Sequence, residues 1–173
     1  MSAAEDGSQA PSGPYMGHGV KQRDLIKMTP DEVEEFIHGK RTATMCTLYA
    51  DGSIHAVGMW YGFIDGHVAM ESKAKAQKVL NLRRDPRITV LIEEGIAYEE
   101  LRGVSIVGTA EIIEDRERLW EVGVSVFSRY NAPYTEEMAP FVEALIHKRV
   151  AIEVIPKKIV TWDHRKLSLP KTT

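Results

Sequence analysis

The chain has 173 residues, of which 43% are hydrophobic and 27% charged, ordinary values for one globular domain with a terminal extension. Its formal net charge of -3 excludes a general attraction to nucleic acid, so any anion-binding function needs a local cluster of cations. The single cysteine, Cys46, excludes an intrachain disulfide, and no apolar run reaches the roughly 20 residues of a membrane span. These properties predict a cytoplasmic protein without a membrane span.

The amino-terminal segment Met1–Gly19 contains Ser, Ala, Gly and Pro but no apolar core of the kind a signal peptide has. We therefore predict a disordered tail over residues 1–24 and one folded domain over residues 25–173. The first predicted element is a helix over Pro30–His38. Thr29 precedes it as a cap, and Glu32 follows three residues later, which is the pattern of a capping box.

After this helix the hydrophobic period changes to that of strands. The segments Thr42–Ala50, Ile54–Ile64 and His67–Ser72 are separated by Asp51-Gly52 and Asp65-Gly66, both strong hairpin signals. The sequence therefore predicts three strands that follow one another in an antiparallel meander.

The second half of the chain mixes both periods. Gly108 interrupts one of its strands, which indicates a bulge or a close approach of two backbones, and Pro156 is expected to break another. The predicted elements are a helix over Lys75–Arg84, strands over Arg87–Glu93 and Val104–Ile113, helices over Asp115–Tyr130 and Thr135–His147, and a strand over Lys148–Asp163. Six or so antiparallel strands with peripheral helices predict a mainly β (α+β) fold built on a small barrel.

The segment Lys73–Arg87 is strongly basic, with six lysines and arginines against the single acid Asp85. It begins where a strand ends and a helix starts, and a helix amino terminus offers free N–H groups and partial positive charge. Ser72 adds a hydroxyl and Gln77 an amide. This combination predicts a site for a phosphate or another anion.

Three lysines of this segment, Lys73, Lys75 and Lys78, lie near the amino end of the predicted helix, where cations oppose the helix dipole. A bound anion would explain their placement. Arg83 and Arg84 lie at the opposite end, where cations complement the dipole without any ligand. The alternative interpretation is a solvated helical face on which lysines are common.

The strand His55–Trp60 is the second candidate feature. Alternation places His55, Val57 and Met59 on one face and Trp60 on the other. An apolar face beside a glycine suits a planar ring. The alternative is that Met59 and Trp60 belong to the barrel core and to a dimer surface.

Other kinds of site lack their sequence patterns. The six histidines never fall in a metal-ligand spacing with cysteine or acid, so no metal site is predicted. Cys46 lies within a predicted strand and is interpreted as a small buried hydrophobic residue rather than a nucleophile. The chain has no glycine-rich phosphate loop and no nucleophile elbow. A cofactor is therefore the expected source of any difficult chemistry.

Several runs of residues, taken together and in order, resemble a known superfamily. They are Met28-Thr29-Pro30-Asp31-Glu32, Met59-Trp60-Tyr61, Glu71-Ser72-Lys73-Ala74-Lys75-Ala76-Gln77-Lys78, Asn81-Leu82-Arg83-Arg84-Asp85-Pro86-Arg87, Leu101-Arg102-Gly103-Val104 and Trp162-Asp163-His164-Arg165-Lys166-Leu167. From about Lys27 to Pro170 the chain resembles the pyridoxamine-5'-phosphate-oxidase-like, FMN-binding-like split β-barrels. Within them it is most similar to actinobacterial deazaflavin (coenzyme F420)-dependent reductases of the B type.

This resemblance implies a homodimer with its cofactor grooves between the subunits. It implies that the cofactor ring lies along His55, Val57 and Met59, and that Trp162 of the partner subunit helps to close the site. The positions that match the family's phosphate-binding junction are Ser72, Lys73, Lys75, Ala76, Gln77 and Lys78.

The resemblance also implies hydride transfer from reduced F420 to a conjugated or electron-poor organic acceptor. Pyridoxamine-phosphate oxidases carry a basic residue at each end of the second-strand motif, where this chain has His55 and Trp60, so FMN is the second choice of cofactor. The alternatives are an FMN-dependent oxidase or reductase and a non-catalytic cofactor-binding dimer. No obligatory acid or base stands out, and His55 is a weak candidate for a proton donor. The segment Glu93–Leu101 is either a lid or a solvated loop.

Overall fold

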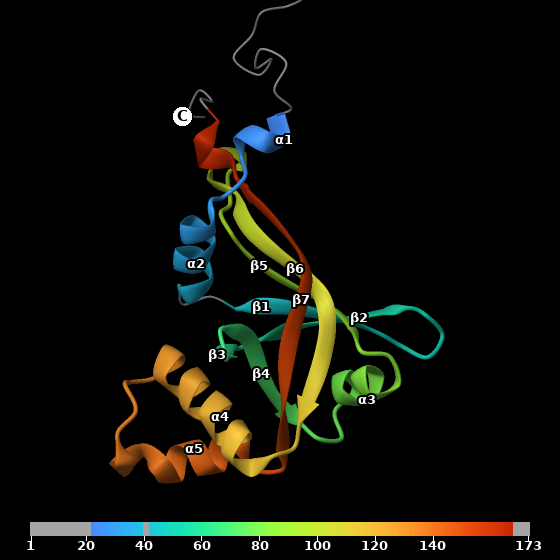
Figure 1. Ribbon diagram of the computed structural model, residues 1–173, viewed down its shortest axis with the longest axis vertical. Coiled ribbons are helices and arrows are strands. Elements are labelled where there is room, and N and C mark those ends of the chain that lie inside the picture. Colours follow the sequence, from blue (N-terminus) through green and yellow to red (C-terminus); the bar gives the residue numbers. More distant parts are fainter. Residues whose placement is uncertain (1–21, 40–41, 168–173) are drawn as a thin grey trace, which may run out of the picture.

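The structure is a computed structural model that describes residues 22–39 and 42–167. Most of the predicted tail lies outside the described residues, and Gln22–Leu25 form helix α1. The described residues form seven strands in one antiparallel sheet with the order β2-β1-β5-β6-β7-β4-β3. The sheet curls into a half-barrel (Figure 1), which confirms the predicted mainly β split-barrel fold with peripheral helices.

The strands are β1 (Ala43–Leu48), β2 (Ile54–Met59), β3 (Gly62–Ile64), β4 (His67–Lys73), β5 (Arg87–Glu94), β6 (Arg102–Ile113) and β7 (Arg149–Asp163). The other helices are α2 (Pro30–His38), α3 (Gln77–Arg84), α4 (Arg116–Tyr130) and α5 (Ala139–Ile146). Within the described residues there are also three short 3-10 turns: η1 (Tyr98–Glu100), η2 (Glu136–Met138) and η3 (His164–Lys166).

The predicted meander is wrong, although both of its hairpins are present. Strand β2 pairs with β1 and strand β3 pairs with β4, but the two pairs lie at opposite ends of the sheet order. The predicted single strand Ile54–Ile64 divides at Trp60-Tyr61, where both side chains are held by residues outside the sheet. Tyr61 is fully buried and its hydroxyl donates to the carbonyl of Ile37 at 2.7 Å, while Trp60 stacks on Tyr130.

Pro156 does not break the last strand, contrary to the sequence prediction. The register between β6 and β7 shifts between Val107 and Gly108, and Pro156 lies opposite Gly108 at this bulge. A Cβ atom on Gly108 would lie 2.0 Å from the carbonyl oxygen of Ile155, so this close approach requires glycine. The bulge absorbs the proline, and β7 continues to Asp163.

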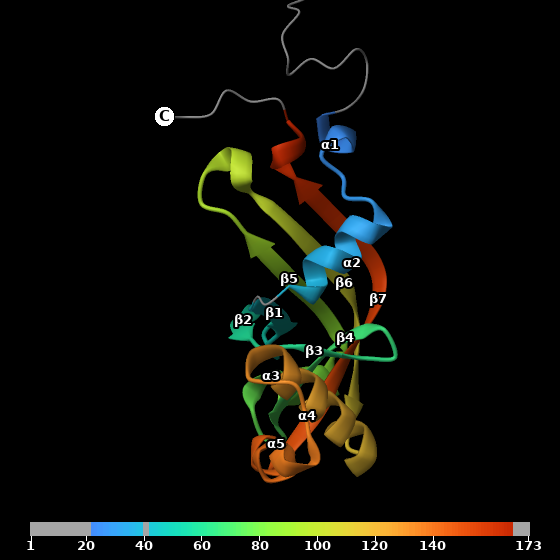
Figure 2. The same ribbon diagram turned by 90° about the vertical axis from the view of Figure 1, so that its left-hand side faces the viewer.

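Helices cover the sheet on two sides of this bulge (Figures 1 and 2). Helix α2, whose predicted capping box between Thr29 and Glu32 is confirmed, packs Phe36 and Ile37 into the larger core cluster. Helices α4 and α5 cover the other end of the sheet through a second cluster that includes Val122 and Ile146. The predicted helix over Thr135–His147 divides into η2 and α5.

Candidate functional site

The junction between β4 and α3 places the predicted phosphate-binding residues together. Strand β4 ends at Lys73, the backbone N–H of Ala76 donates to the carbonyl of Lys73 at 2.9 Å, and α3 begins at Gln77 rather than at Lys75. Ala76 occupies the cap position, and in the described structure no side chain accepts a hydrogen bond from this helix end. The N–H of Val79 donates to the carbonyl of Ala76 at 2.9 Å, so in the described structure the N–H groups of Gln77 and Lys78 are the ones available to an anion.

The three lysines of this junction have different environments. Lys73 donates its Nζ to the carbonyl of His147 at 3.0 Å, so it caps the carboxyl end of α5. Lys75 is exposed in the turn. Lys78 is partly buried, and burial together with the nearby Arg149 guanidinium lowers the pKa of its ammonium group. Lys75 and Lys78 are thus the lysines whose charges remain available to a ligand.

A buried hydrogen-bond chain holds α3 against β1. The Gln77 amide donates to Asn81 at 2.9 Å, and Asn81 donates to the Thr47 hydroxyl at 3.0 Å. Asn81 and Thr47 are both buried. Sequence reasoning missed these two residues, although an asparagine between Val79 and Leu82 on an apolar helix face is a usable signal for a buried polar contact.

Glu71 and Arg149 also lie at this junction and were missed. Glu71 is only 6% exposed, and its Oε2 atom meets no hydrogen-bond partner in the described part of the chain. Burial raises the pKa of Glu71 to about 7, although the positive charges of Arg149 and Lys73 act in the opposite direction. Arg149 lies directly across from Lys73 on β7, and its buried Nε likewise meets no acceptor among the described residues.

Ser72 is buried, and alternation along β4 turns it toward the barrel interior with Val68 and Met70. Lys73 and Glu71 point to the opposite face of the strand. The predicted set therefore divides into an inner hydroxyl and an outer group of charges around the start of α3.

Strand β2 shows the alternation that the sequence predicts. Its residues His55, Val57 and Met59 are partly buried, and Val57 and Met59 pack against the larger core cluster. The Nδ1 atom of His55 is buried without a partner in the described structure, and the ring meets Tyr49 edge-on at 5.3 Å. Trp60 points the other way, is 50% exposed, and stacks on Tyr130 with 4.6 Å between ring centroids.

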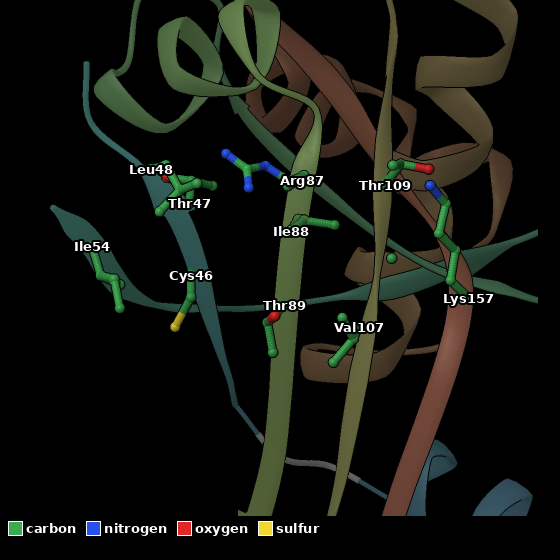
Figure 3. A pocket seen from close by; sticks show the side chains of 11 residues that line it. Cys46, Thr47, Leu48, Ile54, Arg87, Ile88, Thr89, Val107, Thr109 and Lys157 are labelled. Carbon is green, nitrogen blue, oxygen red and sulfur yellow. The ribbon is translucent and has the colours of Figure 1, made fainter. Parts of the chain in front are cut away.

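The outer face of the sheet carries a groove of about 400 Å³. Cys46, Thr89 and Val107 lie on its floor on neighbouring strands, with Arg87 and Lys157 at its edge (Figure 3). Cys46 is only partly buried and faces this groove, which corrects the prediction of a buried core position.

Trp162 lies on the same outer face, across from Gly103, where a Cβ atom would come within 2.3 Å of its ring. It occupies the end of β7 opposite to Arg149, so within one chain it is far from the β4–α3 junction. Trp162 can join that site only from another copy of the chain.

The segment predicted as a lid or loop, Glu93–Leu101, contains the turn η1. The ring nitrogen Nδ1 of His164 bonds the carbonyl of Tyr98 at 2.8 Å, and the two rings lie 4.5 Å apart. Arg102 forms an ion pair with Glu94 at its base. Ile96 remains almost fully exposed, so the tip of the segment is free while its second half is tied to η3.

Residues 22–39 and 42–167 lack two further kinds of feature. No helix there is both long and apolar enough to cross a bilayer. No group of three or more histidine, cysteine or acidic side chains within these residues has the proximity to hold a metal ion.

Comparison with known proteins shows which family has this fold. A family model described as pyridoxamine 5'-phosphate oxidase matches residues 29–163, which is most of the chain. The chain belongs to this family. Among solved structures, a conserved hypothetical protein, Rv2991 from Mycobacterium tuberculosis, is 47% identical with a TM-score of 0.85, over 89% of this chain and 96% of that chain.

More distant members of the fold differ in what they bind. An F420 reductase is 21% identical with a TM-score of 0.55, over 73% of this chain and 94% of its own. The heme storage protein HutZ from Vibrio cholerae is 14% identical with a TM-score of 0.61, over 78% of this chain and 96% of its own. At these identities the likeness shows the fold alone. No curated protein matches the chain.

Proposed function

We propose that this protein is an F420-dependent oxidoreductase that reduces a conjugated or electron-poor organic acceptor. The observation that supports this most directly is the β4–α3 junction, where uncapped N–H groups, Lys75 and Lys78 surround a position suited to an anion. The deazaflavin supplies the hydride when bound. The residues of the chain bind its anionic tail, orient its ring and exclude water around it.

The distribution of cations favours a deazaflavin over FMN. At the ends of the second-strand motif, where pyridoxamine-phosphate oxidases have basic residues, the chain has His55 and Trp60, and Trp60 is stacked on Tyr130. The free positive charge lies instead along Lys75, Lys78 and Arg149, which suits a longer anionic tail. His55 lies on the strand proposed to face the ring, with one buried ring nitrogen, and is the nearest candidate to hold a proton.

The outer face of the sheet supports the proposal of a homodimer. Helices α4 and α5 cover this face only over β3, β4 and β7, whereas its other part, over β2, β1, β5 and β6, presents small and apolar residues such as Ala56, Gly58 and Val107. Sheet faces of this kind are stable when another surface covers them. A second copy placed there would contribute its Trp162 to the cofactor site, as the family resemblance implies.

The test is a titration of the purified protein with F420 and separately with FMN, followed by tryptophan fluorescence. The variant Lys75→Ala/Lys78→Ala should bind F420 at least tenfold more weakly, because two charge-assisted contacts of about 1.5–3 kcal/mol each are lost. The variant Arg23→Ala/Lys27→Ala removes the same number of charges from exposed positions at and just after α1, at the other end of the molecule, and should bind like the parent protein.

Each outcome of this titration decides between functions. Equal affinity of the two double variants contradicts the proposed site. Preference of the parent protein for FMN assigns it to the flavin-dependent oxidases and reductases. Tight binding of F420 without turnover on any acceptor supports a non-catalytic cofactor-binding dimer instead.

A further inference from the structure

Two buried polar atoms without partners mark the ends of β4 and β7 beside α3. In the described structure, Oε2 of Glu71 and Nε of Arg149 are both shielded from solvent and both lack a hydrogen-bond partner. Buried polar atoms are almost always paired, because an unmade hydrogen bond costs about 1–3 kcal/mol. A missing acceptor at Arg149 and an unsatisfied carboxyl oxygen at Glu71 therefore point to a bound group beside the paired ends of these strands.

The charges at this place are unbalanced as well. Lys73 and Arg149 face each other directly across two strands, a like-charge pair that is unfavourable without a counter-charge. Lys78 adds a third cation close enough for Arg149 to lower the pKa of its ammonium group. Glu71 is the one acid among them, and within the described residues it forms no ion pair shorter than 4.0 Å with any of the three.

We propose that Arg149 and Glu71 complete the anion site at the start of α3, and that Glu71 takes up a proton from solvent when the anion binds. Arg149 then donates its Nε–H to one oxygen of a tetrahedral oxyanion such as a phosphodiester. The protonated Glu71 donates its new O–H to a second oxygen. This proposal deepens the proposed function, on which it rests, by adding two residues and a proton to the same site.

The surroundings of Glu71 explain why a proton rather than a cation satisfies it. On its own strand the next residue on the same face is Lys73, which is engaged with the carbonyl of His147, and on β7 Arg149 lies diagonally across from it. Helices α4 and α5 offer that sheet face mainly the apolar side chains of the second core cluster, among them Val122 and Ile146. An ionised Glu71 beside an oxyanion in such an apolar setting would be repelled, so binding favours the neutral acid.

A consequence is that anion binding weakens as the pH rises. Burial already raises the pKa of Glu71 to about 7, and a bound anion raises it further. Below this range Glu71 carries its proton before binding, whereas above it the proton has to be taken up from solvent. Linkage predicts that the affinity falls by up to about tenfold for each pH unit above 7.

Sulfate is the probe, because it remains fully ionised between pH 5.5 and pH 8.5. Its affinity is measured by tryptophan fluorescence at constant ionic strength at both values. We expect the parent protein to bind at least tenfold more weakly at pH 8.5. The variant Glu71→Gln, whose amide donates at every pH, should bind with the same affinity at both values, and Arg149→Met should bind weakly at both.

Glu111→Gln is the matched control, since Glu111 is an exposed glutamate on the neighbouring strand β6. It should keep the pH dependence of the parent protein. A pH-independent affinity of the parent protein, or a pH dependence that survives in Glu71→Gln, overturns the proposal. An absence of sulfate binding also overturns it and leaves ordered water as the group that fills the gap.

The two proposals fail in different ways. Sulfate binding with the expected pH dependence, but without F420 binding, removes the deazaflavin assignment and keeps the roles of Arg149 and Glu71. F420 binding that is independent of pH and unaffected by Arg149→Met removes those roles and keeps the deazaflavin assignment.

Discussion

Two buried glutamates lie on the same face of adjacent strands, and they differ in whether their carboxyl oxygens have hydrogen-bond partners. Glu153 on β7 is opposite Ala69, and Glu71 on β4 is opposite Ala151. Glu153 is 5% exposed, and both of its carboxyl oxygens are paired, one with His67 at 2.7 Å and the other with Arg118 at 3.3 Å. Glu71 is equally buried, yet one of its oxygens lacks any partner in the described structure.

The difference separates a structural charge from a functional one. Glu153 joins β7 to α4 and to the β3–β4 turn, because Arg118 also binds Asp65 at 2.8 Å. Its partners come from the chain itself, so it needs no ligand. Glu71 lies two residue pairs further along the sheet, where α5 ends and the α3 junction begins. Unpaired buried charge at that position reduces the stability of the free protein and favours a ligand there.

The largest expected effect is on Glu71 itself. The variant Glu71→Gln should leave stability unchanged near pH 4, where the carboxyl is protonated in both the folded and unfolded states. As the pH rises from the ordinary glutamate value of 4.5 to about 7, the unfolded state ionises first and the folded parent protein loses stability. The loss is about 1.4 kcal/mol for each pH unit in this window, so the variant should be the more stable protein at pH 8.5.

Thermal unfolding at pH 4 and pH 8.5 measures this difference, and about 2–4 °C of melting temperature corresponds to each 1 kcal/mol for a chain of this size. Equal melting temperatures of the two proteins at pH 8.5 would mean that Glu71 finds a partner in solution. The contrast with Glu153 would then disappear.

A smaller effect of opposite sign is expected at the paired glutamate. The variant Glu153→Gln weakens the charge-assisted bonds to His67 and Arg118, and we expect it to destabilise the protein by about 1–2 kcal/mol at pH 7. Urea unfolding gives this number directly. Sulfate affinity should not change, because Glu153 lies outside the anion site, and a large loss of sulfate binding would show that the two glutamates act as one network.

The elements predicted from sequence are mostly correct because their signals are local. The capping box at Thr29 and the Asp-Gly turns each depend on a few neighbouring residues, and all are present in the structure. Such local signals do not determine the order of the strands in the sheet. Trp60 and Tyr61 divide one hydrophobic run because their partners, Tyr130 and the Ile37 carbonyl, lie far away in the chain.

In the candidate site, too, local sequence signals identified some residues and missed those that depend on long-range contacts. The basic run after β4 predicted an anion site by its charge and its place before a helix. Glu71 and Arg149 escaped notice because what distinguishes them is pairing across strands, and Arg149 comes after α5. The role of Lys73 also depends on that distant contact, since its partner His147 is 74 residues away.

The smallest expected effect distinguishes the two lysines at the turn. Lys73→Ala removes a cation from the carboxyl end of α5 and should cost about 0.5–1 kcal/mol of stability. Lys75→Ala touches an exposed side chain and should change stability by less than about 0.5 kcal/mol, while lowering sulfate affinity a few-fold. Melting temperature and sulfate titration on the two single variants test both halves. If Lys75→Ala lowers stability and leaves sulfate binding intact, the turn is part of the scaffold, and the ligand depends on Lys78 and Arg149 alone.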